Sequence, residues 1–179
     1  LIAKDISMID VPMIQETIAK KLKDSSSSVK DSILDIIEQS PKIEQFYKEV
    51  NINYNDDSVA VRKHVLKLNK RIYETSDSLT VKAYVLSYIL KKIEDEEDAI
   101  IDSAKSFLQN ELFFKIGILN NKPDKQESYC SDIIKIISAI ITSSDKCNEM
   151  FYLFFNFSVL NERLFAADQY TALQGSVKV

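Results

Sequence analysis

Apolar residues recur along most of the chain at spacings of three and four, which indicates amphipathic helices. The clearest case is residues 59–74, where one narrow stripe holds Val61, Val65, Leu68 and Ile72. Comparable stripes run through seven other segments: 12–23, 28–39, 41–53, 79–93, 98–114, 126–142 and 146–165. The pattern therefore predicts about eight helices.

Turn residues group these helices into antiparallel pairs. Pro12 and Pro41 suit the first turn of a helix, where the missing N–H is no loss. The polar segments 24–28, 55–58 and 94–97 supply turns and helix caps. We predict pairs over about 12–40, 41–75, 78–114 and 126–165, and assign no structure to 166–179.

The turns also define a repeat. Asp24, Asp56 and Asp95 begin three of them, at spacings of 32 and then 39 residues, and an apolar residue follows each aspartate five positions later. Lys30 and Arg62 stand six positions after the first two aspartates, whereas Ile101 breaks the rule in the third. Helix pairs with this acid and base resemble the HEAT repeat, which stacks into a solenoid because no single pair can bury its apolar face alone.

The sequence thus predicts an all-α HEAT-repeat solenoid. In HEAT repeats the turn acid and the later base tend to form a ladder of ion pairs between neighbouring repeats. We assign Asp24, Lys30, Asp56 and Arg62 to such a structural ladder, with Arg62 reading as a partner of Asp56.

Composition supports an all-α fold and indicates a reducing compartment. With two glycines and three prolines in 179 residues, the chain cannot be a hairpin-rich β fold. The longest apolar segment, 150–160, is too short to cross a bilayer, and no secretory signal is visible. Cys130 and Cys147 read as small core residues in a reducing compartment. Because the chain begins without Met, we interpret it as part of a longer protein.

No pattern of catalytic residues is present. The chain has one histidine, no glycine-rich phosphate loop and no Cys/His cluster. The acids from Glu94 to Asp98 lack the spacing and the glycine of a calcium loop, and acids also favour a helix N-terminus. We therefore predict no enzyme activity, no catalytic residues, no cofactor and no metal site.

One helix face is unusually basic for a chain of net charge −4. Opposite the apolar stripe of residues 59–74 lie Lys63, Lys67, Lys70 and Arg71, with His64 at the edge of this basic face. Between Val59 and Thr75 the only acid is Glu74, whereas surface helices usually mix both signs. A solvated face and a surface for an anionic partner are equally compatible with this pattern. A phosphate backbone is the commonest such partner, and Lys20, Lys21 and Lys23 would extend the track if they share its side.

Three stretches carry a more specific resemblance: Leu22–Ile37, Asp57–Leu68, and Ile93–Ile101 with Phe113-Phe114 closing its helix. In this order they resemble successive repeats of the adherin (Nipped-B-like) family, the large subunit of the cohesin loader. The resemblance continues more loosely through the isoleucine-rich helix and Asn148-Glu-Met-Phe151, and it fades after about Phe165.

The resemblance implies a hook-shaped solenoid in the nucleus that loads cohesin onto chromosomes. It implies binding to the backbone of double-stranded DNA, contacts with the cohesin kleisin and ATPase heads, and stimulation of cohesin's ATPase without hydrolysis by the loader itself. A small tetratricopeptide subunit would bind a family region that this chain lacks. The family's usual Val-Arg-Lys-Arg-Val reads Val61-Arg-Lys-His-Val65 here, so a weaker donor, His64, holds the last basic position.

We accordingly predict DNA-binding roles for Lys63, His64, Lys67, Lys70 and Arg71. The alternative is a HEAT-repeat scaffold that binds proteins, similar to nuclear transport receptors or phosphatase scaffolds. In that case the basic face would meet an acidic peptide.

Overall fold

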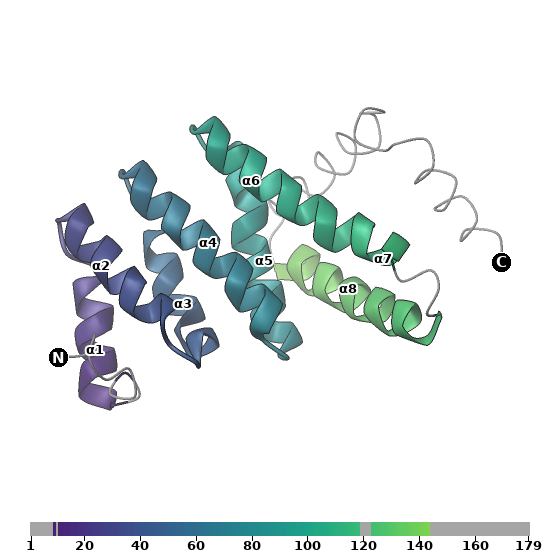
Figure 1. The fold of residues 1–179 in the computed structure, drawn as a ribbon, viewed down its shortest axis with the longest axis horizontal. Helices are drawn as coiled ribbons and strands as arrows, with labels where there is room; N and C mark the ends of the chain where they lie inside the picture. Colours follow the sequence, from purple (N-terminus) through teal and green to yellow (C-terminus); the bar gives the residue numbers. More distant parts are fainter. Residues whose placement is uncertain (1–8, 10, 119–122, 144–179) are drawn as a thin grey trace.

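The computed structural model describes residues 9, 11–118 and 123–143, and in them it shows helices and no strand (Figure 1). Helices α2 (Ser27–Glu38), α4 (Val59–Thr75) and α6 (Asp98–Gln109) lie side by side in one layer. Helices α1 (Pro12–Lys21), α3 (Tyr47–Val50) and α5 (Leu79–Lys91) form a second layer behind them. Each helix of one layer is joined by a short turn to its partner in the other. The predicted all-α fold of antiparallel helix pairs is confirmed.

The core lies between the two layers. The predicted stripe of α4 is buried throughout, with Leu68 and Ile72 fully covered, because α4 packs on α5 behind it and on α2 and α6 beside it. Other fully buried side chains come from the first and third pairs and include Leu22, Leu34, Ile37, Leu86, Ile89, Leu90 and Ile100. One continuous apolar core therefore joins the repeats.

The helix predicted over 41–53 is not continuous, and that prediction is wrong. A 3₁₀ turn at Ile43–Phe46 precedes α3, and a second 3₁₀ turn at Asn51–Asn53 follows it. The Asn51 side chain donates to the carbonyl oxygen of Tyr47 at 2.8 Å. This is the acceptor that a continuing α-helix would use, and such side-chain competition is why asparagine disfavours helix interiors.

Asn51 also locks this broken segment to α4. Its amide and that of Asn69 are both buried, and they exchange two hydrogen bonds of 2.8 Å. Each amide satisfies the other inside the apolar core, so the pair fixes the position of the broken segment against α4 without leaving a polar group unpaired.

Asn69→Ala should lower the free energy of unfolding by about 1–3 kcal/mol, because the buried Asn51 Oδ1 loses its donor while Asn51 Nδ2 keeps the Tyr47 carbonyl. Urea denaturation followed by circular dichroism measures this change. In the double variant Asn51→Ala/Asn69→Ala no orphaned amide remains, so its cost should be well below the sum of the single costs. Additive costs would contradict the pairing.

The third pair extends into the next helix. A π-helical turn at Asn110–Phe114 and α7 (Lys115–Ile118) continue α6, and α8 (Pro123–Ser143) then packs on α5. Within the π turn, the buried Glu111 binds Lys115 at 2.6 Å and its carbonyl oxygen accepts from the Tyr129 hydroxyl at 2.6 Å. Burial, next to the Glu111 carboxylate, raises the pKa of Tyr129. These contacts dock α8 onto the third pair.

The two cysteines and the last predicted helix lie in or beyond the C-terminal part of the described residues. Cys130 is a free, half-buried thiol, whereas Cys147 and the predicted helix at 146–165 lie outside the described residues. In the described part of the chain, no helix combines the length and apolar character needed to cross a bilayer.

Candidate nucleic-acid interface

The basic face belongs to α4, the middle helix of its layer. The Asp56 carboxylate accepts from the Ser58 amide at 2.9 Å and so shapes the turn into the helix. Helix α4 packs on α5 and lies between α2 and α6 (Figure 1), and its basic side chains contact α2 on one side and α6 or the turn before it on the other.

Two of the predicted basic residues reach toward α6. Lys63 forms an ion pair with Glu97 at 2.9 Å, and both side chains are largely exposed. Lys70 donates to the carbonyl and hydroxyl oxygens of Ser103, each at 2.6 Å, and its ammonium lies over the Phe107 ring. Burial lowers the pKa of Lys70. Lys63 is thus the more available of the two.

The other three reach toward α2. The Lys67 ammonium lies 2.6 Å from Glu38 while 66% of its side chain stays exposed. Arg71 donates to the carbonyl oxygen of Glu38. His64 is only 10% exposed and contacts Asp31 at 2.8 Å, so its ring lies in the seam between α2 and α4 and not on the open face.

The cations of α4 are therefore paired across helices. The acids that the α4 sequence lacks are supplied by its neighbours, with Asp31 and Glu38 on α2 and Glu97 before α6. Lys67 in particular holds the pKa of the Glu38 carboxyl below its usual value. The resulting surface mixes both signs, and its most exposed cations are Lys63 and Lys67. Of the lysines suggested to extend the track, Lys21 ends α1 in the other layer and pairs with Asp24 at 3.2 Å.

The turn aspartates share one local geometry. Each accepts a hydrogen bond from the backbone amide two residues on: Asp24 at 3.0 Å, Asp56 at 2.9 Å and Asp95 at 3.1 Å. The other carboxylate oxygen of Asp56 and of Asp95 meets a cation of the preceding repeat, whereas that of Asp24 meets Lys21 of its own helix pair.

The later base of one repeat meets the turn acid of the next. Lys30 lies 2.6 Å from Asp56, and Arg62 donates to both carboxylate oxygens of Asp95 at 3.1 and 3.0 Å. Toward its own turn, Arg62 binds the carbonyl oxygen of Asp56 and not the carboxylate. Asp95 also binds Lys92 at 2.8 Å.

Hydrogen bonds keep the turn acids of these contacts charged in spite of their burial. Burial alone would raise the pKa of Asp95, but hydrogen bonds from Arg62, Lys92 and the Glu97 amide lower it to about 2. The pKa of Asp56 is lowered in the same way by Lys30 and Ser58 against the opposing effect of burial. Both acids are therefore carboxylates at neutral pH. The sequence register contained Asp95 but did not reveal that Arg62 pairs with it.

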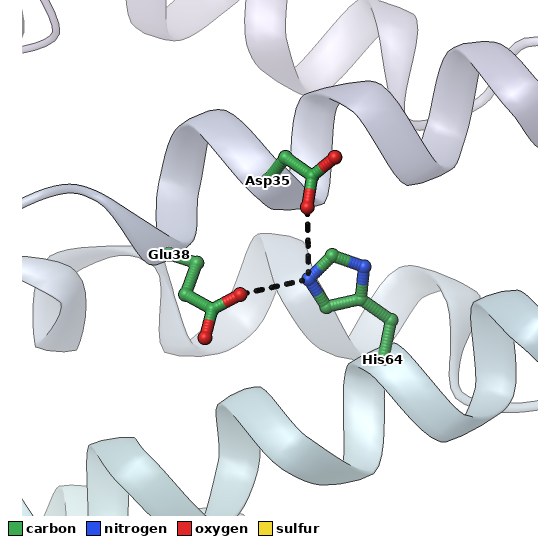
Figure 2. Close-up of side chains that lie close together, drawn as sticks. All are labelled: Asp35, Glu38 and His64. Atoms are coloured by element: carbon green, nitrogen blue, oxygen red, sulfur yellow. Dashed lines mark ion pairs between the residues drawn. The ribbon is translucent and has the colours of Figure 1, made fainter.

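Sequence reasoning missed one cluster. In Figure 2, Asp35 and Glu38 of α2 converge on His64 of α4, with one ligand atom from each residue lying within 4.8 Å of the others. The signal available in the sequence was weak, because the acids and the histidine belong to different repeats. By contrast, the acids considered from Glu94 to Asp98 include Asp95 and Glu97, which are engaged with Arg62 and Lys63.

The profile of a family described as "HEAT repeat associated with sister chromatid cohesion" matches residues 1–37. Sister chromatid cohesion protein 2 of Saccharomyces cerevisiae is 41% identical over 170 residues, which make up 95% of this chain and 11% of that protein. Sister chromatid cohesion protein mis4 of Schizosaccharomyces pombe is 28% identical over 123 residues, covering 66% of this chain and 8% of the relative. The chain thus spans about a tenth of the length of these relatives.

Among solved structures, a C-terminal fragment of the Chaetomium thermophilum cohesin loader SCC2 matches with a TM-score of 0.58 at 18% identity, covering 98% of this chain and 16% of that one. At this identity the match carries the fold alone, and it confirms the predicted HEAT-repeat solenoid. The sequence identity to the yeast protein extends over almost the whole chain. The chain therefore belongs, as a segment of HEAT repeats, to the sister chromatid cohesion protein 2 family.

Proposed function

We propose that this chain is a non-enzymatic segment of a cohesin-loading protein that acts on chromatin in the nucleus, and that α4 contributes to its contact with DNA. The observation that carries the proposal is the 41% identity to sister chromatid cohesion protein 2 over 95% of the chain. The protein containing this segment would contact the cohesin kleisin and ATPase heads, stimulate the cohesin ATPase, and bind a small tetratricopeptide subunit elsewhere.

Within α4 the exposed cations are the main candidates for phosphate contacts. Lys63 and Lys67 keep 46% and 66% of their side chains exposed even while paired. Exposed ion pairs contribute at most about 1 kcal/mol, so a DNA phosphate can replace Glu97 or Glu38 at small cost. Lys70, Arg71 and His64 already bind oxygens of the neighbouring helices. Their side chains would have to leave these contacts before they could bind a DNA phosphate.

Binding of this kind carries affinity but no sequence preference, because it contacts only the backbone. Each lysine that meets a phosphate releases a counterion from the DNA, so the affinity should fall steeply with added salt. Salt dependence therefore reports the number of phosphate contacts directly.

Lys63→Glu/Lys67→Glu should weaken duplex DNA binding by about tenfold or more and reduce the slope of log K against log salt by about two. Fluorescence anisotropy with duplexes of unrelated sequence, over a salt series, measures both quantities. The matched control is Lys48→Glu/Lys125→Glu, which makes the same charge change at exposed positions of α3 and α8. Equal losses in both variants, or no loss in the first, would rule out the α4 site.

One observation favours a second candidate, a protein-binding scaffold. The acids of α2 and α6 interleave with the cations of α4, and a mixed-sign surface also fits a partner that carries both charges. If an acidic peptide displaces the duplex from the wild-type chain but binds the double variant as tightly as before, the peptide uses another surface. If the peptide binds only the wild type and DNA binds neither chain, the scaffold explanation is correct.

A further inference from the structure

We propose that His64, Glu38 and Asp35 form a binding site for a divalent transition-metal ion, with Zn²⁺ the best match, and that the ion joins the first repeat to the second. The inference concerns the seam between α2 and α4 and does not depend on DNA binding.

The geometry of the histidine carries the argument. Its Nε2 atom lies 3.5 Å from Glu38 Oε2 and 3.9 Å from Asp35 Oδ1 (Figure 2). That nitrogen is buried and makes no hydrogen bond. A buried nitrogen without a hydrogen bond, aimed between two carboxylates, is an unusual arrangement for a protein interior.

Asp31 determines which ring nitrogen can bind a metal. Its Oδ1 lies 2.8 Å from His64 Nδ1. A carboxylate only accepts, so Nδ1 carries the hydrogen and, in the neutral imidazole, Nε2 carries the lone pair. A metal-binding histidine commonly donates its other N–H to a carboxylate in this way, which orients the ring and raises its basicity.

The carboxylates are placed to complete the site. Asp35 and Glu38 stand three residues apart on α2 and so share a face. Zinc bonds to nitrogen and oxygen are about 2.0–2.2 Å, which places tetrahedral ligands about 3.4 Å apart. The separations from the histidine, 3.5 and 3.9 Å, are close to this value, and all three ligand atoms lie within 4.8 Å of one another, so the carboxylates must move inward to complete the site. Asp35, 62% exposed, can make this movement by a rotation of its side chain, and water would fill the remaining position.

The ligand set also selects the class of ion. One imidazole and two carboxylates suit zinc and similar transition metals, whereas calcium and magnesium prefer oxygen ligands alone. Lys67 is the competing cation. It binds Glu38 Oε1 and leaves Oε2 facing the histidine, so its positive charge opposes the incoming ion.

Isothermal titration calorimetry with Zn²⁺ tests the site on the whole chain, free of any histidine tag and carrying Cys130→Ser and Cys147→Ser to remove thiols that bind zinc. We expect one ion per chain. Because the protein has a single histidine, long-range ¹H–¹⁵N spectra of its ring report the site without ambiguity, and the Nε2 resonance should shift on zinc addition.

Removal of a ligand or of its orienting contact should weaken zinc binding, and removal of the competing cation should strengthen it. Loss of a ligand in His64→Gln or Asp35→Asn should weaken zinc binding by at least about tenfold, and Asp31→Ala by about 10–100-fold through the orienting contact. Lys67→Gln should strengthen it severalfold by removing the competing charge. Asp102→Asn, an exposed acid on α6, is the matched control and should change nothing.

Asp35→Asn changes only an exposed side chain, so it tests the site even if a substitution of His64 disturbs folding. The proposal is overturned if zinc leaves the ring resonances in place, if the affinity is unchanged in Asp35→Asn, or if Lys67→Gln weakens binding. The first outcome would identify the cluster as a set of acids around the ring that binds no metal.

Discussion

Asp95→Asn is expected to lower the free energy of unfolding by about 3–5 kcal/mol, the usual cost of removing one partner from a buried ion pair. The Asp95 side chain is 3% exposed, and it is shared by Arg62 and Lys92, which are also largely buried. Asparagine keeps the size and the hydrogen bond to the Glu97 amide but leaves both cations without a charged partner. Urea denaturation measures the change, which is a large fraction of the 5–15 kcal/mol typical of a folded domain.

The same contact should appear in the acid stability of the wild type. The Asp95 carboxyl has a pKa of about 2 in the folded chain, below about 3.9 in an unfolded one. Its stabilising effect is therefore complete above about pH 5 and is lost progressively as the pH falls through the unfolded pKa and then through 2. In the Asp95→Asn variant the free energy of unfolding should therefore fall less between neutral and acidic pH than it does in the wild type.

Asp24→Asn is the matched control for this prediction. Asp24 makes the same Asx-turn hydrogen bond, but its carboxylate is more exposed and its cation partner is the exposed Lys21. Its substitution should have a much smaller effect. Asparagine keeps the turn hydrogen bond at both positions, so equal costs would show that the buried ion pair is not the source of the stability.

Leu68→Ala is expected to cost about 2–5 kcal/mol, because Leu68 is fully buried where α4 packs against its neighbours. The cost combines the lost burial of the side chain with the cavity that rigid neighbours cannot fill. Thermal and urea unfolding measure it. Leu68→Met nearly conserves volume and should cost less than about 1.5 kcal/mol.

Ile134→Ala provides the opposite control, since that isoleucine is 63% exposed on α8. Its substitution should stay within about 0.5 kcal/mol of the wild type. A cost for Leu68→Ala no larger than that of Ile134→Ala would contradict the placement of α4 at the centre of the core.

The parts of the fold that local periodicity determines could be predicted from the sequence. The stripe of Val61, Val65, Leu68 and Ile72 is buried as expected because a single helix face meets the core along its length. The segment around Asn51 was mispredicted for an equally physical reason. Its apolar spacing fits a helix, but a buried side-chain amide competes for the backbone acceptor and pairs with a distant asparagine.

The surroundings of the basic face could not be predicted from local sequence. The sequence of α4 identifies a basic face but not the groups opposite it, because Asp31, Glu38 and Glu97 belong to adjacent repeats and reach α4 only after stacking. The His64 cluster depends on the same stacking. The register of turn aspartates predicts which helices become neighbours, and it was the clue in the sequence to this stacking.

The alternation of charge across the layer also encodes the order of the repeats. In sequence, α2 carries more acids than bases, α4 carries almost only bases, and acids cluster at the start of α6. A second copy of α4 in the place of α6 would set ammonium against ammonium, and a second copy of α2 in the place of α4 would set carboxylate against carboxylate. Like charges at these seams would penalise skipped or swapped neighbours while the chain folds. The apolar stripes of different repeats are similar and do not distinguish one neighbour from another. The charges between adjacent helices do, so they favour the native order of the helix pairs.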